Sequence, residues 1–242
     1  MIKLSGALAA LAMAAACATS PKSDPITHGL QLMAEMKAAT GGAKLDALTT
    51  YHASGKRVRD GRINGTFDEW GDMRTTANAT RETFEGVTVS SGYDGKVGWS
   101  VGPDGAVDIE SNPERLGWTR LGAYVNSQGY LFPERFPATF EFRGREEADG
   151  KSYDVVKVTP DGAASVDMWL DPDTHLLARL VASNGPGKLG LLVQEYRTVD
   201  GVKVVRHALQ TLQTGDQMRT ETQDIVSYKF EPVPADLFSP PR

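Results

Sequence analysis

Residues 111–132, SNPERLGWTRLGAYVNSQGYLF, interrupt a chain that otherwise alternates apolar and polar residues as β-strands do. Asn112, Pro113 and Glu114 predict a helix start, because asparagine caps helices, proline suits the first helical position and a carboxylate stabilises the positive end of the dipole. Gly129 is a typical helix end. Apolar residues recur between them at helical spacing: Trp118, Leu121 and Val125, flanked by Leu116 and Tyr124. We therefore expect a helix over residues 112–128.

A single apolar helix in a β-rich chain must bury its stripe against a sheet. We expect this helix to cover the hollow of a curved antiparallel sheet. Two interpretations of the stripe remain open. The helix either completes a solid core, or it closes a cavity that holds a ligand.

Eleven other segments have the alternation of strands, and many are joined by turn residues such as Asp60-Gly61, Asp94-Gly95 and Asp200-Gly201. Parallel strands need long crossovers, so this order predicts antiparallel pairing, and a sheet of this size curls or closes. A leading helix is expected over residues 27–39. The predicted fold is mainly β (α+β): a curved, unclosed antiparallel barrel of about eleven strands, with helices over its concave face. The predicted strands are residues 50–59, 62–70, 86–91, 96–101, 139–145, 152–159, 165–170, 176–182, 189–199, 202–214 and 220–230.

The alternation also indicates which strand positions face the helix. Large apolar side chains occupy every second position of several predicted strands. Because successive strand residues point to opposite sides, these side chains are expected to share the concave face. The candidates are Trp99, Phe140, Phe142, Met168 and Leu170.

The first 16 residues predict a signal peptide, because a lysine precedes an apolar run, residues 4–16, that ends in small residues. This run is too short to span a bilayer, which takes about 20 residues. The single cysteine, Cys17, follows it directly. That position resembles a bacterial lipobox, which implies a lipidated Cys17, a tether over residues 17–26 and a single domain over residues 27–242. The alternative is ordinary cleavage near Ala16 or Ala18 with Cys17 unmodified.

Charge and histidine spacing exclude several classes of function. The formal net charge of −5 provides no basic surface for nucleic acid. None of the four histidines has a second ligand at metal spacing, so neither a metal site nor a cofactor is predicted. These histidines are His28, His52, His175 and His207.

Two enzyme-like motifs lack the structural context that their chemistry needs. Residues 98–102, GWSVG, match the nucleophile elbow around Ser100, but that elbow requires a helix directly after it, and a turn with another extended segment follows instead. Residues 185–190, GPGKLG, match a dinucleotide fingerprint by letter, but a strand pattern follows them. No enzyme activity is predicted.

The chain resembles the LolA/LolB-like outer-membrane lipoprotein-sorting proteins in the order of five features. These are a leading helix ending at Gly41-Gly42, GTFDEW at 65–70, GYDGKVGW at 92–99, WLDPDTHLL at 169–177 and FEPVPADLFSP at 230–240. The resemblance implies an unclosed barrel of about eleven strands with a helical lid over an apolar cavity for acyl chains. It implies neither catalysis nor a metal.

This resemblance predicts an acyl chain, or the lipid moiety of a lipoprotein, buried between the helix and the concave face. The expected lipid-binding residues are Trp99, Trp118, Leu121, Tyr124, Val125, Phe140, Phe142, Met168 and Leu170. The expected protein is a monomeric outer-membrane lipoprotein that faces the periplasm and contacts the membrane through Cys17; a soluble periplasmic protein is the alternative. Envelope-stress sensing, a structural envelope lipoprotein and a hydrolase using Ser100 are the other functions considered.

Overall fold

The computed structural model describes residues 24–184 and 187–241. The predicted signal peptide, Cys17 and most of the tether lie outside the described residues, as do Gly185 and Pro186 of the glycine-rich motif. In the described part of the chain, no helix is long and apolar enough to cross a membrane.

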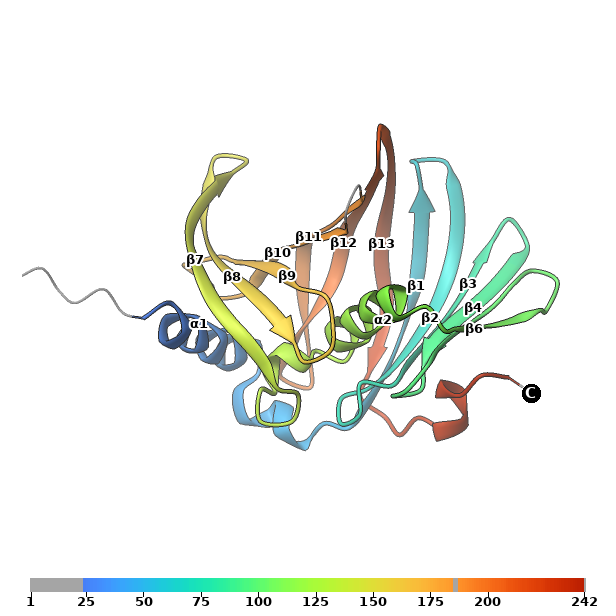
Figure 1. Cartoon of the computed structure of the whole chain (residues 1–242), viewed down its shortest axis with the longest axis horizontal. Coiled ribbons are helices and arrows are strands. Elements are labelled where there is room, and N and C mark those ends of the chain that lie inside the picture. Colours follow the sequence, from blue (N-terminus) through green and yellow to red (C-terminus); the bar gives the residue numbers. More distant parts are fainter. Residues whose placement is uncertain (1–23, 185–186, 242) are drawn as a thin grey trace, which may run out of the picture.

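The described strands form one antiparallel sheet, in the order β6-β5-β4-β3-β2-β1-β13-β12-β11-β10-β9-β8-β7. Strands β1 and β13 pair near the middle, so β6 and β7 form the two edges (Figure 1). The strand bounds are β1 Thr50–Arg59, β2 Ile63–Asp72, β3 Asn78–Phe84, β4 Val87–Tyr93, β5 Gly98–Val101, β6 Val107–Glu110, β7 Ala138–Ala148, β8 Lys151–Pro160, β9 Val166–Leu170, β10 Leu177–Asn184, β11 Gly187–Val199, β12 Val202–Thr214 and β13 Gln217–Lys229.

The predicted fold, a curved and unclosed antiparallel barrel with few helices, is confirmed. The sheet has 13 strands instead of about eleven, and the additional ones are β3 and β6. In β3, NATRETF, Ala79 and Phe84 are the apolar residues, so the strand does not alternate. Strand β6, VDIE, has four residues and was expected to be an extended connection.

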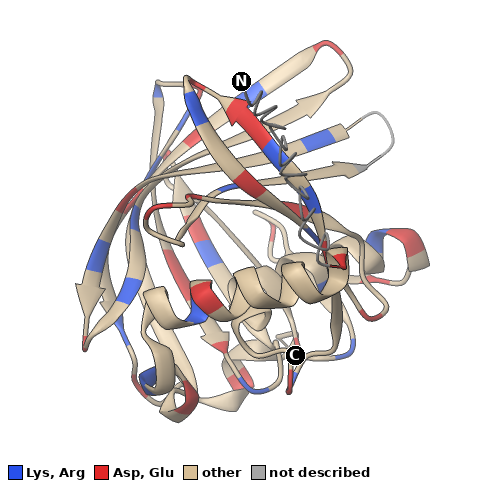
Figure 2. Cartoon of the chain, turned by 90° about the vertical axis from the view of Figure 1, so that its left-hand side faces the viewer, with Lys and Arg blue, Asp and Glu red and all other residues tan. Residues whose placement is uncertain are grey.

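Helix α2, Pro113–Asn126, connects the two edges of the sheet. Strand β6 ends at Glu110 and β7 begins at Ala138, with α2 and the 3-10 turn η2, Gly129–Leu131, between them. Because β6 and β7 are on opposite edges of a curled sheet, this connection has to cross its hollow. Figure 1 shows α2 lying across the concave side, as the sequence predicts, whereas the helix nearest the viewer in Figure 2 is the leading helix α1, Pro25–Thr40.

The start of α2 follows its sequence signals. The Asn112 side chain accepts hydrogen bonds from the backbone N–H groups of Glu114 and Arg115 at 2.9 and 3.1 Å, and Pro113 is the first helical residue. The helix ends at Asn126, slightly before the predicted end, and Gln128 adopts a left-handed conformation with φ of 56°. Gly129 instead opens η2, where a Cβ would lie 2.6 Å from the Tyr124 ring.

Helix α1, Pro25–Thr40, lies against β7 (Figure 1). Asp24 caps it by accepting a hydrogen bond from the Thr27 backbone N–H at 3.1 Å. Gly29 permits close packing, because a Cβ there would lie 2.4 Å from the Phe140 carbonyl oxygen. Leu32, Met33 and Met36 on the buried face of α1 join the main core. A second 3-10 turn, η1 Gly42–Ala47, connects α1 to the sheet.

The buried apolar residues form two clusters. The main one lies on the concave side, between the sheet and the helices α1 and α2. The smaller one contains Trp99 and Phe238 and lies where the C-terminal 3-10 turn η3, Ala235–Phe238, packs near β3. This second cluster means that both faces of the β3–β5 region are partly covered.

Candidate functional site

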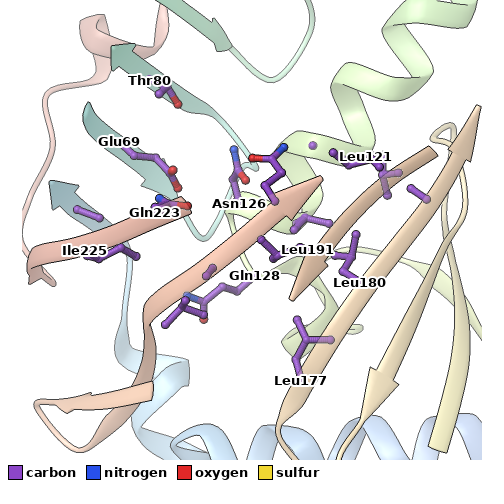
Figure 3. A pocket seen from close by; sticks show the side chains of 18 of the residues that line it. Glu69, Thr80, Leu121, Asn126, Gln128, Leu177, Leu180, Leu191, Gln223 and Ile225 are labelled. Atoms are coloured by element: carbon purple, nitrogen blue, oxygen red, sulfur yellow. The ribbon is translucent and has the colours of Figure 1, made fainter. Parts of the chain in front are cut away.

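A cavity of about 460 Å³ lies between α2 and the concave face of the sheet (Figure 3). This volume falls within the range of about 300–1,000 Å³ that is typical of small-molecule sites. Its lining comes from both sides of the curved sheet and from the helix that connects them. The cavity therefore exists because α2 spans the hollow without filling it.

One half of the cavity is aliphatic. The register pairs Leu180 of β10 with Leu191 of β11, and Ala182 with Leu189, so each pair projects from the same face of the sheet. These four side chains line the cavity together with Leu177 of β10 and with Val205 and Ala208 of β12. Trp118, Leu121 and Val125 of α2 close this half from above.

The other half is polar and lies on β1 to β4 and β13. Figure 3 shows Glu69, Thr80 and Gln223 on the side opposite Leu121, Leu180 and Leu191. The register places Glu69 of β2 opposite Thr80 of β3, and Thr80 opposite Ser91 of β4, so a row of polar side chains crosses three strands. The remaining polar lining residues include Arg57 and Glu82 of these strands, Gln128 between α2 and η2, and Gln210 of the neighbouring strand β12.

Arg57 is at the centre of the polar half and its side chain is 11% exposed. Its guanidinium forms an ion pair with Glu82, and its Nη2 lies 3.8 Å from Glu69 Oε2. Its Nε lies 3.4 Å from Glu221 Oε1 but has no hydrogen-bond partner among the described residues. Burial lowers the pKa of Arg57, and the carboxylates of Glu69 and Glu221 oppose that change. The group remains a cation, because arginine is not deprotonated in proteins.

Arg59 extends this ion-pair network away from the cavity. Its Nη2 lies 2.8 Å from Glu82 and its Nε lies 2.7 Å from Glu221. The network thus contains two guanidinium groups and three carboxylates. At formal charges it has one negative charge in excess.

Two aromatic residues connect the C-terminal end of α2 to the sheet. The Tyr51 hydroxyl lies 2.8 Å from the carbonyl oxygen of Asn126 and 2.6 Å from Glu69 Oε1. Tyr228 stacks on Tyr51 with ring centroids 5.1 Å apart, and its hydroxyl accepts a hydrogen bond from Gln128 Nε2 at 3.2 Å. Burial raises the pKa of both tyrosines, and the Glu69 carboxylate raises it further, so both hydroxyls stay protonated.

The N-terminal half of α2 makes more exposed contacts. Arg115, with a side chain 70% exposed, forms an ion pair with Glu110 at 2.9 Å. Arg120 donates to the Gly162 carbonyl at 3.2 Å, and the Ala164 backbone N–H donates to the Gly117 carbonyl at 3.2 Å. Exposed contacts of this kind contribute little stability. The helix is therefore attached more firmly at its C-terminal end.

Of the nine predicted lipid-binding residues, Trp118, Leu121 and Val125 line the cavity. Three others share its sheet face without lining it: Met168 is opposite Leu180, Leu170 is opposite Leu177, and Phe140 is paired with Val158. All three are fully buried in the main core. They belong to the packed core that supports the cavity.

Tyr124 and Phe142 do not line the cavity, and their rings contact other side chains. The buried Tyr124 ring packs edge-on against Tyr130 at 6.4 Å, and its hydroxyl has no hydrogen-bond partner among the described residues. Burial raises its pKa. The Phe142 ring lies 4.1 Å from the ring of His28 on α1. Phe142 is thus covered by the leading helix.

The expectation that Trp99 lies opposite α2 is wrong. A Cβ on Gly98 would lie 2.8 Å from Thr119 of α2, so Gly98 faces the helix and its neighbour Trp99 points to the other side of the sheet. There the indole N–H of Trp99 donates to the Phe238 carbonyl at 2.8 Å. The sequence pattern could not show this, because the covering segment comes from the C-terminal end of the chain.

The aliphatic residues of β10 and β11 and the whole polar half were not predicted from the sequence. A register shift between Leu177 and Arg179 breaks the alternation of β10, so Leu177 and Leu180 line the same cavity three residues apart. The strands that carry Arg57, Glu69 and Glu82 have polar residues at alternate positions, a pattern typical of a face in water. In this fold, that face is the inside of the half-barrel.

The structure gives Ser100 the surroundings of a strand residue. Ser100 lies in β5, opposite Ser91 of β4 and Asp108 of β6, and the next element is β6. It lines a second hollow of about 250 Å³, and none of the residues lining that hollow is a histidine. Across the described residues, no group of three or more histidine, cysteine, aspartate or glutamate side chains is placed to hold a metal ion.

No family model and no curated protein matches the chain by sequence. Solved structures do match it. A DUF1329 family protein from Desulfovibrio piger has a TM-score of 0.61 at 13% identity, over 90% of this chain and 98% of that one. A LolA superfamily protein from Nitrosomonas europaea has a TM-score of 0.58 at 10% identity, over 87% and 97%. A domain named for outer membrane lipoprotein sorting, from Vibrio parahaemolyticus, has a TM-score of 0.56 at 13% identity, over 88% and 97%.

These likenesses define the class of fold. The unclosed antiparallel barrel with a helix across its concave side is a LolA-like fold. The resemblance to the LolA/LolB-like proteins that the sequence motifs indicate is confirmed at the level of the fold.

Proposed function

We propose that the chain binds an acyl chain in the cavity between α2 and the sheet. The observation that carries this proposal is the cavity of about 460 Å³, half of it lined by leucine, valine and alanine side chains under an apolar helix. Each methylene moved from water into such surroundings contributes about 0.8 kcal/mol. A chain of ten methylenes would therefore gain roughly 8 kcal/mol before the cost of ordering it.

The fold supports a role in the transport or reception of lipids or lipoproteins in the bacterial envelope, without catalysis. The similar structures include a LolA superfamily protein and a domain named for outer membrane lipoprotein sorting. Ser100 has neither a following helix nor a histidine beside it, which argues against the hydrolase alternative. Envelope-stress sensing and a purely structural role are both compatible with the fold, and ligand binding separates the second from the proposal.

Attachment through Cys17 is part of the same proposal and rests on the sequence alone. A lipidated Cys17 would place a monomeric domain at the periplasmic surface of the outer membrane, about ten residues from its anchor. Changing Cys17 to serine is expected to move the protein from the membrane fraction to the soluble fraction. A wild-type protein without added acyl mass would leave the soluble periplasmic alternative.

The proposed binding site can be tested with one tryptophan. Trp118 lines the cavity, whereas Trp70, Trp99 and Trp169 do not. A fatty acyl probe brominated along its chain should quench Trp118 fluorescence in the wild type, and this quenching should be lost in Trp118→Phe.

Trp99→Phe is the matched control, because Trp99 lies on the opposite face of the sheet under η3. The control should keep the quenching of the wild type. Absence of saturable quenching in the wild type, or equal quenching in Trp118→Phe, would contradict binding at this site.

A further inference from the structure

The polar half of the cavity determines which head group an acyl ligand can carry. Arg57, Glu69 and Glu82 are the charged residues of the lining, and all three come from neighbouring strands of one side of the sheet. Leu180, Leu191 and Leu121 lie on the other side (Figure 3). A ligand that fills the whole cavity therefore has one apolar end and one polar end.

The charges of this half disfavour an anion. Glu82 is paired with both arginines, but Glu69 is 3.8 Å from Arg57 and its other oxygen accepts from the Tyr51 hydroxyl. Glu221 behind them adds a third carboxylate to two guanidinium groups. A carboxylate or phosphate placed among these groups would meet an excess of negative charge in surroundings of reduced polarity, where like charges repel strongly.

The same half offers partners for a neutral head group. Carboxylate oxygens of Glu69 and Glu82 can accept hydrogen bonds, and the hydroxyls of Thr80 and Ser91 beside them can donate or accept. Gln223 is opposite Arg57 in the register and also lines the cavity. A head that carries hydroxyl or amide N–H groups matches this set better than one that only accepts.

A second hollow continues the polar half outward. Thr80, Glu82 and Ser91 line both the cavity and the hollow of about 250 Å³ that contains Ser90 and Ser100. Ser91 and Ser100 are opposite each other in the register, so the polar row of Glu69, Thr80 and Ser91 extends to β5. This direction leads away from the leucines. A head group larger than the polar half therefore has room along β4 and β5.

We infer that the site selects a neutral, hydrogen-bond-donating amphiphile, such as an acyl chain on a glycerol ester or an amide, and discriminates against a free fatty acid. This inference rests on the proposed function, because it assigns the head-group end of the same acyl site. Its chain would lie under α2 on β10–β12. Its head group would lie between Arg57, Glu69 and Thr80 and point toward Ser91.

Two probes with the same chain test the selectivity: 1-monolauroylglycerol and laurate, each measured at pH 8 below its micelle concentration by displacement of a fluorescent acyl probe. We expect the wild type to bind the glycerol ester at least tenfold more tightly than laurate. Equal binding, or tighter binding of laurate, would overturn the selectivity while leaving acyl binding intact. Failure of both probes and of the fluorescent probe would contradict the proposed function instead.

A variant that reverses the sign of the network's excess charge provides a second test of the selectivity. In the double variant Glu69→Gln and Glu82→Gln, the network keeps two arginines and one glutamate, so its excess charge becomes positive. Laurate binding should strengthen at least tenfold relative to the wild type. Glu146→Gln, an exposed residue of β7, has the same chemistry away from the cavity and should change neither affinity. If the double variant does not fold, the ratio of the two affinities in the wild type still decides the question.

Discussion

The hydroxyl oxygen of Tyr51 lies 2.8 Å from the carbonyl oxygen of Asn126, the last residue of α2. Tyr51 belongs to β1, near the middle of the sheet. Helix α2 begins 54 residues after the end of β1, and strands β2 to β6 lie between them in the sequence. The contact therefore fixes one end of the helix to β1, which pairs with the central strand β13 and lies far from both edges of the sheet. The hydroxyl is also 2.6 Å from Glu69, so it links the helix to the polar half of the cavity.

Tyr51→Phe should destabilise the protein by about 2 kcal/mol, because it removes a hydrogen bond to a charged group and leaves buried acceptors without a donor. Tyr196→Phe is the comparison, since the Tyr196 hydroxyl donates at 2.7 Å to a neutral acceptor, the Leu177 carbonyl. That change should cost about 1 kcal/mol. The free energies of unfolding from urea titrations give both values. A smaller loss for Tyr51→Phe than for Tyr196→Phe would contradict the role assigned to Tyr51.

Stability should fall steeply in alkaline solution. Burial raises the pKa of Tyr51, Tyr124, Tyr130, Tyr196 and Tyr228. The unfolded chain loses these protons near pH 10, while the folded chain keeps them, so the unfolded state binds fewer protons above that pH. Each such group then lowers the free energy of unfolding by up to about 1.4 kcal/mol per pH unit. Below about pH 9 the effect should be absent.

Urea titrations between pH 8 and 11 measure this slope, and Tyr196→Phe tests its origin. The variant lacks only the Tyr196 hydroxyl, whose proton the folded state keeps, and retains every other ionisable group. Its free energy of unfolding should therefore fall less steeply above pH 10, by up to about 1.4 kcal/mol per pH unit. Identical slopes for the two proteins would mean that the Tyr196 hydroxyl is not protected in the folded state.

The helix could be predicted because its signals are local. Asn112, Pro113 and the stripe of Trp118, Leu121 and Val125 lie within 14 residues, and capping and helical spacing act over that range. The turns formed by Asp-Gly pairs are equally local signals, and they determine the antiparallel order of the strands. The curved sheet then follows from the number of strands and the absence of long crossovers among them.

The polar half of the site could not be predicted, because it depends on contacts between distant strands. Arg57, Glu82 and Glu221 come together only after β1 has paired with both β2 and β13. Charged residues at alternate strand positions ordinarily indicate a face in water. Here that face is the inside of an open barrel, where opposite charges partly compensate one another. Trp99 was misplaced for a related reason, since η3 covers the outer face of its strand.

Leu121 distinguishes a cavity wall from a solid core, the two interpretations that the sequence left open. It belongs to the main core cluster and also lines the cavity, so part of its surface already lacks protein neighbours. Leu121→Ala should therefore cost about 2 kcal/mol, at the low end of the range for buried leucines. Leu131→Ala, a residue 1% exposed that does not line the cavity, should cost about 4 kcal/mol. Urea titrations compare them, and equal losses would indicate that the space beside Leu121 is packed in solution.

Gly122 offers a way to fill the cavity from the helix. It lies in α2, lines the cavity, and a Cβ at this position would meet no other atom within 4 Å. Gly122→Leu should raise the free energy of unfolding by about 1 kcal/mol, because leucine is a better helix residue than glycine.

The same change should weaken acyl binding at least tenfold, since the leucine side chain would occupy the volume of the ligand. Gly117→Leu is the matched control: it is in the same helix and its Cβ would approach only the Ala164 nitrogen, at 4.0 Å, but it does not line the cavity. Its affinity for the fluorescent acyl probe should remain that of the wild type. Thermal unfolding and probe titration on both variants give the two readouts together. A stable Gly122→Leu protein that still binds the probe with wild-type affinity would place the ligand somewhere other than under α2.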